Sequence, residues 1–278
     1  MTRVMTKVFA IAAVVICIGT FVTMLIGLIN SGYQSLSFEF LFSSPRNFGL
    51  EGGIAPILIS TSMILVLAIL FAVPISMLTA IFLFFRCRCD TVQTRLILTV
   101  LELLASIPSI VFGLFGMLFF CDFLHLGFSI LSGGLTLALM IFPTLCLTLF
   151  ASFLTLPNET RMVSESLGLS RLTVARHLLI PHSISGIVAG IVLGVCRCVA
   201  ETAALIFTSG YSIRQPRSIF DSGRSLSVHI YELAMNVAGG DANANAAALV
   251  LLIVLLIINL LIFAIVDRQP NWIRSANH

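Results

Sequence analysis

An arginine and a glutamate one helical turn apart are the residues best suited to do chemistry. Arg197 and Glu201 are the only charged residues in the apolar segment 184–209. A charge near the middle of a bilayer costs at least about 2.5–3.5 kcal/mol on insertion scales, so a partner or a polar cavity is required. The planar guanidinium fork suits tetrahedral oxyanions. We predict that Arg197 binds an anion as it crosses the membrane. Glu201 is expected to keep Arg197 in place and to prevent it from binding the anion too tightly for release.

A self-contained Arg197–Glu201 ion pair is the alternative. Arginine before glutamate is the less favourable i, i+4 order, and one carboxylate cannot saturate five N–H donors. Glu102 is a third charge in an apolar segment, seven residues after Arg95 and therefore roughly 10 Å inside the membrane. Two carboxylates and one arginine give this half of a pathway a charge of −1. Either a companion chain supplies more arginine, or Glu102 is protonated or paired elsewhere.

The composition indicates that lipid surrounds most of this chain. Of 278 residues, 59% are apolar and 10% charged, against about 25% charged in ordinary soluble domains. A soluble enzyme, a disordered chain and a secreted disulfide scaffold are excluded. The single lysine, Lys7, cannot complete a phosphate-binding P-loop, and zinc-protease and hydrolase signatures are missing. We predict no catalytic residue and no metal ligand, and interpret the C-x-C pairs Cys87/Cys89 and Cys196/Cys198 as small buried apolar residues.

Six long, charge-poor runs position these residues. Each exceeds the roughly 20 residues that a helix needs to cross hydrocarbon. The runs are 8–29, 54–85, 96–120, 123–156, 184–209 and 242–266. They predict an all-α, polytopic membrane protein with six transmembrane helices. The first run is too long for a signal peptide and is expected to be an uncleaved anchor.

The distribution of basic residues predicts the orientation. With the N-terminus inside, ten Lys and Arg residues fall on the cytoplasmic side and four outside, namely Arg46, Arg214, Arg217 and Arg224. Both termini are therefore expected to be cytoplasmic. The longest extramembrane segments, 157–183 and 210–241, are too short for a core of their own. Residues 1–278 are expected to form one transmembrane domain, and any energy-converting domain must be another chain.

Segment 157–183 does not look like membrane. Pro157 ends the preceding helix, and Gly168 interrupts a helical pattern of apolar residues. We predict two short helices along the cytoplasmic face, joined at residues 168–170. An ordinary amphipathic connector would show the same composition.

This segment resembles the cytoplasmic loop of permease subunits in binding-protein-dependent ABC importers, E-A-A-x-x-x-G-x9-I-x-L-P. Gly168 and Pro181 have the required spacing of thirteen, and residues 178–180 read Leu-Leu-Ile. The Glu-Ala-Ala part would fall on residues 162–164, which read Met-Val-Ser, whereas Glu165 comes three residues later. The resemblance implies that an ATPase docks on Glu165, Gly168, Leu169 and Pro181.

Three further segments are similar to the permeases of phosphate importers, and among these to the PstA-type subunit. Residues 106–116 (SIPSIVFGLFG) resemble a third-helix motif, and 196–204 (CRCVAETAA) resemble a G-R-A-x-G-E-T-A-A stretch with both glycines replaced. Residues 44–46 and 51–54 resemble the outer loop of that subunit. The resemblance implies the type-I ABC importer permease fold and inorganic phosphate as substrate.

The same resemblance implies the partners. A second permease would complete the pathway, two copies of an ATP-binding subunit would use ATP and Mg²⁺, and a soluble phosphate-binding protein would deliver substrate outside. The chain itself would bind no cofactor and no nucleic acid, and would reside in the bacterial inner membrane. A sulfate or molybdate permease is the nearest alternative. An ATPase-independent secondary transporter or channel would favour inverted repeats, which we do not see between 1–140 and 141–278. A membrane scaffold would leave Arg197 unexplained.

Overall fold

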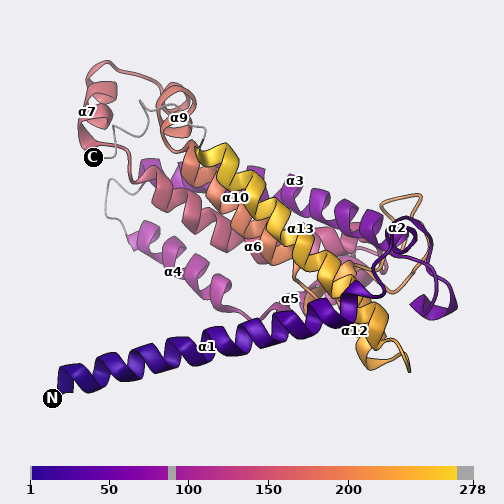
Figure 1. Cartoon of the computed structure of the whole chain (residues 1–278). Coiled ribbons are helices and arrows are strands. Elements are labelled where there is room, and N and C mark those ends of the chain that lie inside the picture. Colours follow the sequence, from indigo (N-terminus) through magenta and orange to yellow (C-terminus); the bar gives the residue numbers. More distant parts are fainter. Residues whose placement is uncertain (1, 87–91, 268–278) are drawn as a thin grey trace.

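The computed structural model describes residues 2–86 and 92–267 and shows an elongated bundle of helices (Figure 1). In these residues the only extended pairing is an isolated bridge between Arg46 and Glu51. The chain is all-helical, as predicted. Cys87 and Cys89 lie outside the described residues.

Four helices are long and apolar enough to cross a membrane. They arise from the uninterrupted apolar runs, because a helix satisfies every backbone polar group internally where no water is available. Ser129 caps one of them, its Oγ accepting a hydrogen bond from Ser132 N at 3.1 Å. The four are α1 (Thr2–Tyr33), α3 (Ala55–Arg86), α6 (Ile130–Phe153) and α13 (Asp241–Asp267).

The third predicted span is not straight. It consists of α4 (Val92–Ser106), α5 (Ser109–Gly116) and the π-helical turn η3 (Met117–Phe123), with a 94° bend between α4 and the rest. Pro108 lies at the bend with φ −58° and ψ 141°. A proline lacks the N–H that would continue the helix and disfavours the helical conformation of the residue before it. The expected single helix over 96–120 is therefore wrong.

The fifth predicted span also departs from one helix over 184–209. Its main helix, α10 (Ile184–Val199), ends ten residues early and is followed by the short α11 (Ala203–Ile206). Before it, α8 (Arg171–Val174), η4 (Ala175–Leu179) and α9 (Ile180–His182) form a helical stretch bent by 75° from α10. The described chain thus has four spans, or six if each bent pair is one span.

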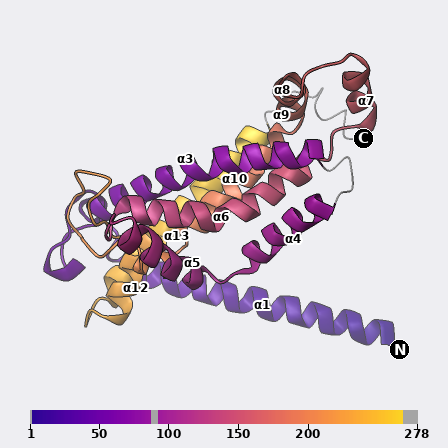
Figure 2. The same ribbon diagram turned by 180° about the vertical axis from the view of Figure 1, so that it is seen from behind.

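The core lies between α3 and α6, which run side by side with α10, α13 and α4 around them (Figures 1 and 2). Ile64, Leu137, Leu149 and Phe153 are fully buried there. Helix α1 approaches α13 near its own C-terminal end, where a Cβ on Gly32 would lie 2.8 Å from Asn245 O. Toward its N-terminus α1 diverges from the bundle, and most of its apolar side chains are exposed.

The two ends of the bundle carry different elements. Helix α7 (Asn158–Ser166), α8 and α9 gather at one end, toward which the N-terminal end of α1 and the C-terminal end of α13 both point (Figure 2). At the other end lie α2 (Phe38–Phe42), η1 (Asn47–Gly49) and α12 (Leu226–Met235).

Candidate functional site

Arg197 lies in the last turn of α10 and is half-buried. Its Nη1 donates a hydrogen bond to Thr144 Oγ1 at 3.3 Å. Thr144 follows Pro143 near the middle of α6, so the guanidinium lies about half-way along the bundle. The C-terminal end of a helix carries partial negative charge and favours a cation. One hydroxyl engages one of five donors, which leaves the fork able to bind an anion.

Glu201 follows the end of α10, and its carboxylate bonds to backbone. Its Oε1 accepts a hydrogen bond from Ala204 N at 3.2 Å, at the first turn of α11. Within the described chain no ion pair joins Glu201 to Arg197. This arrangement differs from both interpretations of the sequence, since each of them paired the two side chains. The i, i+4 geometry that would bring them together is lost because the helix ends at Val199. Glu201 shapes the turn after Arg197 instead.

The two segments singled out in the sequence, 106–116 and 196–204, pack directly against each other. A Cβ on Gly113 would lie 2.8 Å from Ala204 Cα and 3.2 Å from Ala204 O. Only glycine permits this approach of α5 to α11, because the atoms opposite belong to backbone. Gly116 is similarly close to the side chain of Thr136 on α6. The bent third span therefore supports the turn that contains Glu201.

Helix α12 is part of the site, although the sequence suggested only an outer loop over 210–241. Ser227 Oγ donates to the Glu201 carbonyl oxygen, and Leu226 N donates to Thr61 Oγ1 of α3 at 2.9 Å. Ser225 caps the helix, its Oγ accepting from Val228 N at 3.3 Å. The signal was available: two serines flank Leu226 just before an apolar run, which is typical of a helix start.

A buried histidine and an arginine lie beside this helix start. His229 is 1% exposed, and its Nδ1 lies 3.5 Å from Arg224 Nη1. Arg224 Nε donates to Tyr211 O at 3.1 Å. Burial, and then the neighbouring guanidinium, lower the pKa of His229 from 6.5 to about 4. The imidazole is therefore neutral at physiological pH, so no second positive charge lies beside Arg224.

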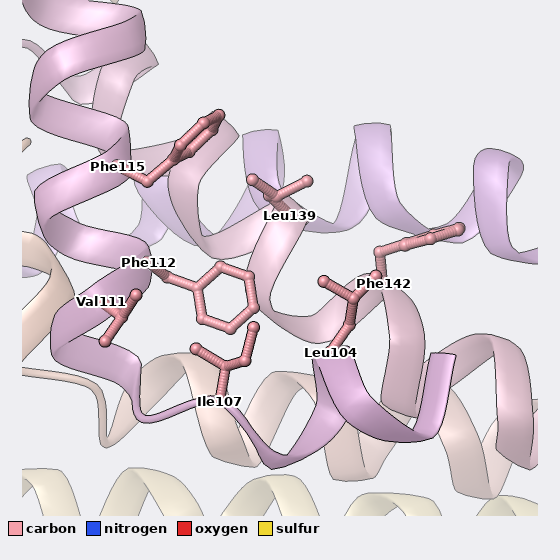
Figure 3. A pocket seen from close by; sticks show the side chains of 7 residues that line it. All are labelled: Leu104, Ile107, Val111, Phe112, Phe115, Leu139 and Phe142. Carbon is pink, nitrogen blue, oxygen red and sulfur yellow. The ribbon is translucent and has the colours of Figure 1, made fainter. Parts of the chain in front are cut away.

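The bend of the third span borders an apolar cavity of about 360 Å³. Side chains of α4, the linker, α5 and α6 line it, including Leu104, Ile107, Phe112 and Phe142 (Figure 3). All of its lining residues are apolar, so this cavity cannot satisfy an oxyanion. Arg197 therefore remains the better candidate for anion contact.

Glu102 is exposed on α4. Among the described residues, none donates a hydrogen bond to its carboxylate and none forms an ion pair with it. The structure brings Arg197 together with Thr144, but it does not join Glu102 to that pair by any polar contact in the described chain. The role of Glu102 stays a prediction.

Segment 157–183 contains two short helical stretches, α7 and the stretch 171–182, joined at residues 167–170. Gly168 has φ +63°, and Leu169 N donates to Ser164 O at 3.1 Å. This is a Schellman ending, which favours glycine because the left-handed conformation strains other residues. Ser170 then caps the next stretch, accepting from Thr173 N at 3.1 Å.

Of the residues expected to dock an ATPase, Gly168 and Leu169 lie in this connection, and Pro181 lies in α9. Leu169 and Pro181 are exposed, and Glu165 lies in the last turn of α7.

In the part of the chain that the structure describes, no group of three or more His, Cys, Asp or Glu residues could hold a metal ion. Cys196 and Cys198 do not form such a site; the Sγ of Cys196 contacts the Asn259 side-chain amide.

Comparison with known proteins defines the class. Residues 72–275 match the family described as binding-protein-dependent transport system inner membrane component, and the chain belongs to this family. The fold is similar to a chain of the MetNI methionine ABC transporter in an inward-facing conformation, with a TM-score of 0.62, 15% identity, and coverage of 76% of this chain and 94% of that one. The protein is a permease subunit of an ABC importer and a multi-pass protein of the bacterial inner membrane.

Among individual relatives, a probable ABC transporter permease protein YqgI of Bacillus subtilis is 29% identical, over 96% of each chain. The phosphate transport system permease protein PstA 2 of Mycobacterium tuberculosis is 30% identical, over 94% of this chain and 86% of its own. A phosphate transport system permease protein PstC of Mesorhizobium japonicum is 30% identical, over 86% and 81%. The resemblance to phosphate permeases found in the sequence extends to named relatives.

Proposed function

We propose that this chain moves inorganic phosphate across the membrane as one permease of an ATP-driven importer. The observation that carries the proposal is the half-buried guanidinium of Arg197, which binds a neutral hydroxyl rather than a carboxylate at mid-bundle depth. A tetrahedral oxyanion can accept two N–H bonds from such a fork. Two relatives named as phosphate permeases support the choice of oxyanion.

In this proposal Arg197 binds phosphate transiently, and Thr144 orients the guanidinium. Glu201 does not neutralise the arginine; it stabilises the turn that begins α11. A second permease completes the passage, two copies of an ATP-binding subunit dock on 157–183, and a soluble binding protein delivers phosphate outside. Closure of the ATPase pair displaces the docking helices and switches the passage between its two openings. ATP and Mg²⁺ are bound by the partner, and this chain contributes no catalytic residue.

Uptake of radiolabelled phosphate by cells that carry Arg197→Gln tests the proposal. We expect normal insertion in the membrane and abolished uptake, because glutamine lacks the charge and the planar fork. Thr144→Val, which removes the orienting hydroxyl, should reduce uptake roughly fivefold, the value of a hydrogen bond of about 1 kcal/mol. Arg46→Gln, in the outer loop, is the matched control and should transport normally. Wild-type uptake by Arg197→Gln would show that the assignment is wrong.

Sulfate and molybdate are the alternative oxyanions, since the same fork would bind them. Competition in the uptake assay separates them: excess phosphate, but not sulfate or molybdate, should suppress labelled uptake. Isolation of the complex from membranes separates the importer from an ATPase-independent transporter. A preparation that transports without any ATP-binding subunit would exclude the importer mechanism.

A further inference from the structure

The polar residues of α4 form one narrow stripe. Arg95, Thr99, Glu102 and Ser106 follow one another at intervals of four, three and four residues. At 3.6 residues per turn they fall within about 60° of each other around the helix. Every other residue from 96 to 105 is apolar, and all four stripe residues are exposed.

The described part of the bundle leaves this stripe exposed. Helix α4 packs against α6, and Leu101, on another side of α4, is 4% exposed and part of the core. Glu102, in the centre of the stripe, has no polar partner among the described residues. Ser106 Oγ is bonded locally to Leu103 O at 2.7 Å. The stripe is therefore an outward face of this chain.

Lipid cannot solvate that face. Helix α4 is the first part of a bent candidate span, and ionisable residues in spans face a bundle interior or a water-filled cavity. No element of residues 2–86 or 92–267 covers Thr99, Glu102 and Ser106, so another chain must enclose them. The carboxylate of Glu102 also requires an opposite charge if it is to stay ionised there.

We infer that the α4 stripe faces a second permease chain across a water-containing passage, and that this second chain presents an arginine or lysine opposite Glu102. The inference rests on the proposed pairing of two permeases and extends it to a surface. Charge complementarity identifies the occupant: lipid offers no cation within the hydrocarbon, whereas a facing helix can.

Water access to the stripe is the first test. Thr99→Cys and Ser106→Cys are placed in a variant with all native cysteines replaced, within the complete transporter in membrane vesicles. Leu96→Cys and Leu103→Cys are matched controls, because both leucines are 62% exposed on a flank of the same helix. A small water-soluble maleimide should label the stripe positions severalfold faster than the flank. Equal, slow labelling of both sets would place the stripe in lipid and overturn the inference.

The facing cation is tested by charge reversal. Glu102→Lys should cause loss of the second permease when the complex is purified in detergent, because two cations would face each other, whereas Glu102→Gln should retain most of it. Replacing the opposing arginine or lysine by glutamate should restore co-purification of Glu102→Lys. Full retention of the second permease by Glu102→Lys would refute the facing cation.

Neither measurement uses phosphate. Vesicles whose stripe labels as expected but which take up no phosphate would contradict the proposed substrate and leave this inference standing. Conversely, normal phosphate uptake combined with a stripe that does not label would refute the inference alone.

Discussion

At the level of single residues, the environment of Arg197 follows from where α10 ends. A helix continuing to residue 209 would have placed Glu201 one turn above the arginine. Because α10 stops at Val199, the carboxylate turns to Ala204 N and the guanidinium finds Thr144. The sequence singled out both charged residues. Their four-residue spacing could not reveal that the helix ends between them, because neither proline nor glycine marks that end.

His229 makes the stability of the α12 region dependent on pH. Its pKa is about 4 in the folded protein against 6.5 ordinarily, so the unfolded chain binds more protons between these values. The contribution of neutral His229 to the free energy of unfolding is therefore complete above about pH 6.5 and is lost progressively as the pH falls toward 4. We expect the purified complex to melt at a lower temperature at about pH 5 than at about pH 7.5.

Two variants isolate this effect. His229→Gln cannot gain the proton and should lose much of the difference in melting temperature between the two pH values. His125→Gln, at an exposed position, is the control and should keep it. An unchanged difference in His229→Gln would mean that other groups cause the pH dependence.

At the level of elements, long apolar runs predicted α1, α3, α6 and α13 well, because each run is long enough to cross hydrocarbon and a helix satisfies its own backbone polar groups there. The bends were harder. Pro74 and Pro143 lie inside continuous helices, whereas Pro108 separates α4 from α5. Packing distinguishes Pro108 from the other two prolines. After Pro108, α5 turns away from the direction of α4 and packs on α11, which the absence of a side chain at Gly113 permits. Such a contact between distant segments cannot be derived from local sequence.

The connection between α7 and α8 predicts a particular pattern of tolerance at Gly168. A Cβ there would meet nothing within 4 Å, so the constraint is the φ of +63° rather than space within this chain. Gly168→Asn, which adopts this conformation readily, should retain coupling. Gly168→Val should disturb the turn at a cost of about 1–2 kcal/mol, and Gly168→Trp should also obstruct a docked partner.

Phosphate uptake and ATP hydrolysis, measured together in vesicles, check this series. We expect hydrolysis without proportionate uptake for Gly168→Trp, smaller uncoupling for Gly168→Val, and near-normal coupling for Gly168→Asn. If uptake survives Gly168→Trp, the segment 157–183 is not the docking site.

At the level of the whole molecule, hydropathy and charge predicted an all-helical membrane protein, while α12 escaped detection. Its ten residues are too few to form a span, and its first turn is hydrogen-bonded to Thr61 and Glu201, which are remote in sequence. Charge counting treated Arg224 as an ordinary outer-loop residue, although its guanidinium is bonded to the Tyr211 carbonyl. The serines at the start of α12 indicate a helix, but its place in the bundle depends on tertiary contacts that no local pattern shows.

Orientation can be tested on the intact chain. The basic residues predict cytoplasmic termini, and the N-terminal end of α1 points toward the same end of the bundle as α7 (Figure 1). An epitope inserted after Arg214 should be accessible from outside in intact cells, whereas epitopes at the N-terminus and after Gly168 should require permeabilised cells. An N-terminal epitope accessible in intact cells would reverse the predicted orientation.

The bend at Pro108 has a consequence for biosynthesis. Helix α4 has 15 residues, about 22 Å of helix at 1.5 Å per residue, so it is shorter than a hydrocarbon core of about 30 Å. Neither half of the pair can settle in the bilayer as an independent unit while the ribosome is still producing the next segment. Stable integration of this region must await the synthesis of α6 and α11, so nascent chains truncated before residue 206 should be vulnerable to membrane quality-control proteases.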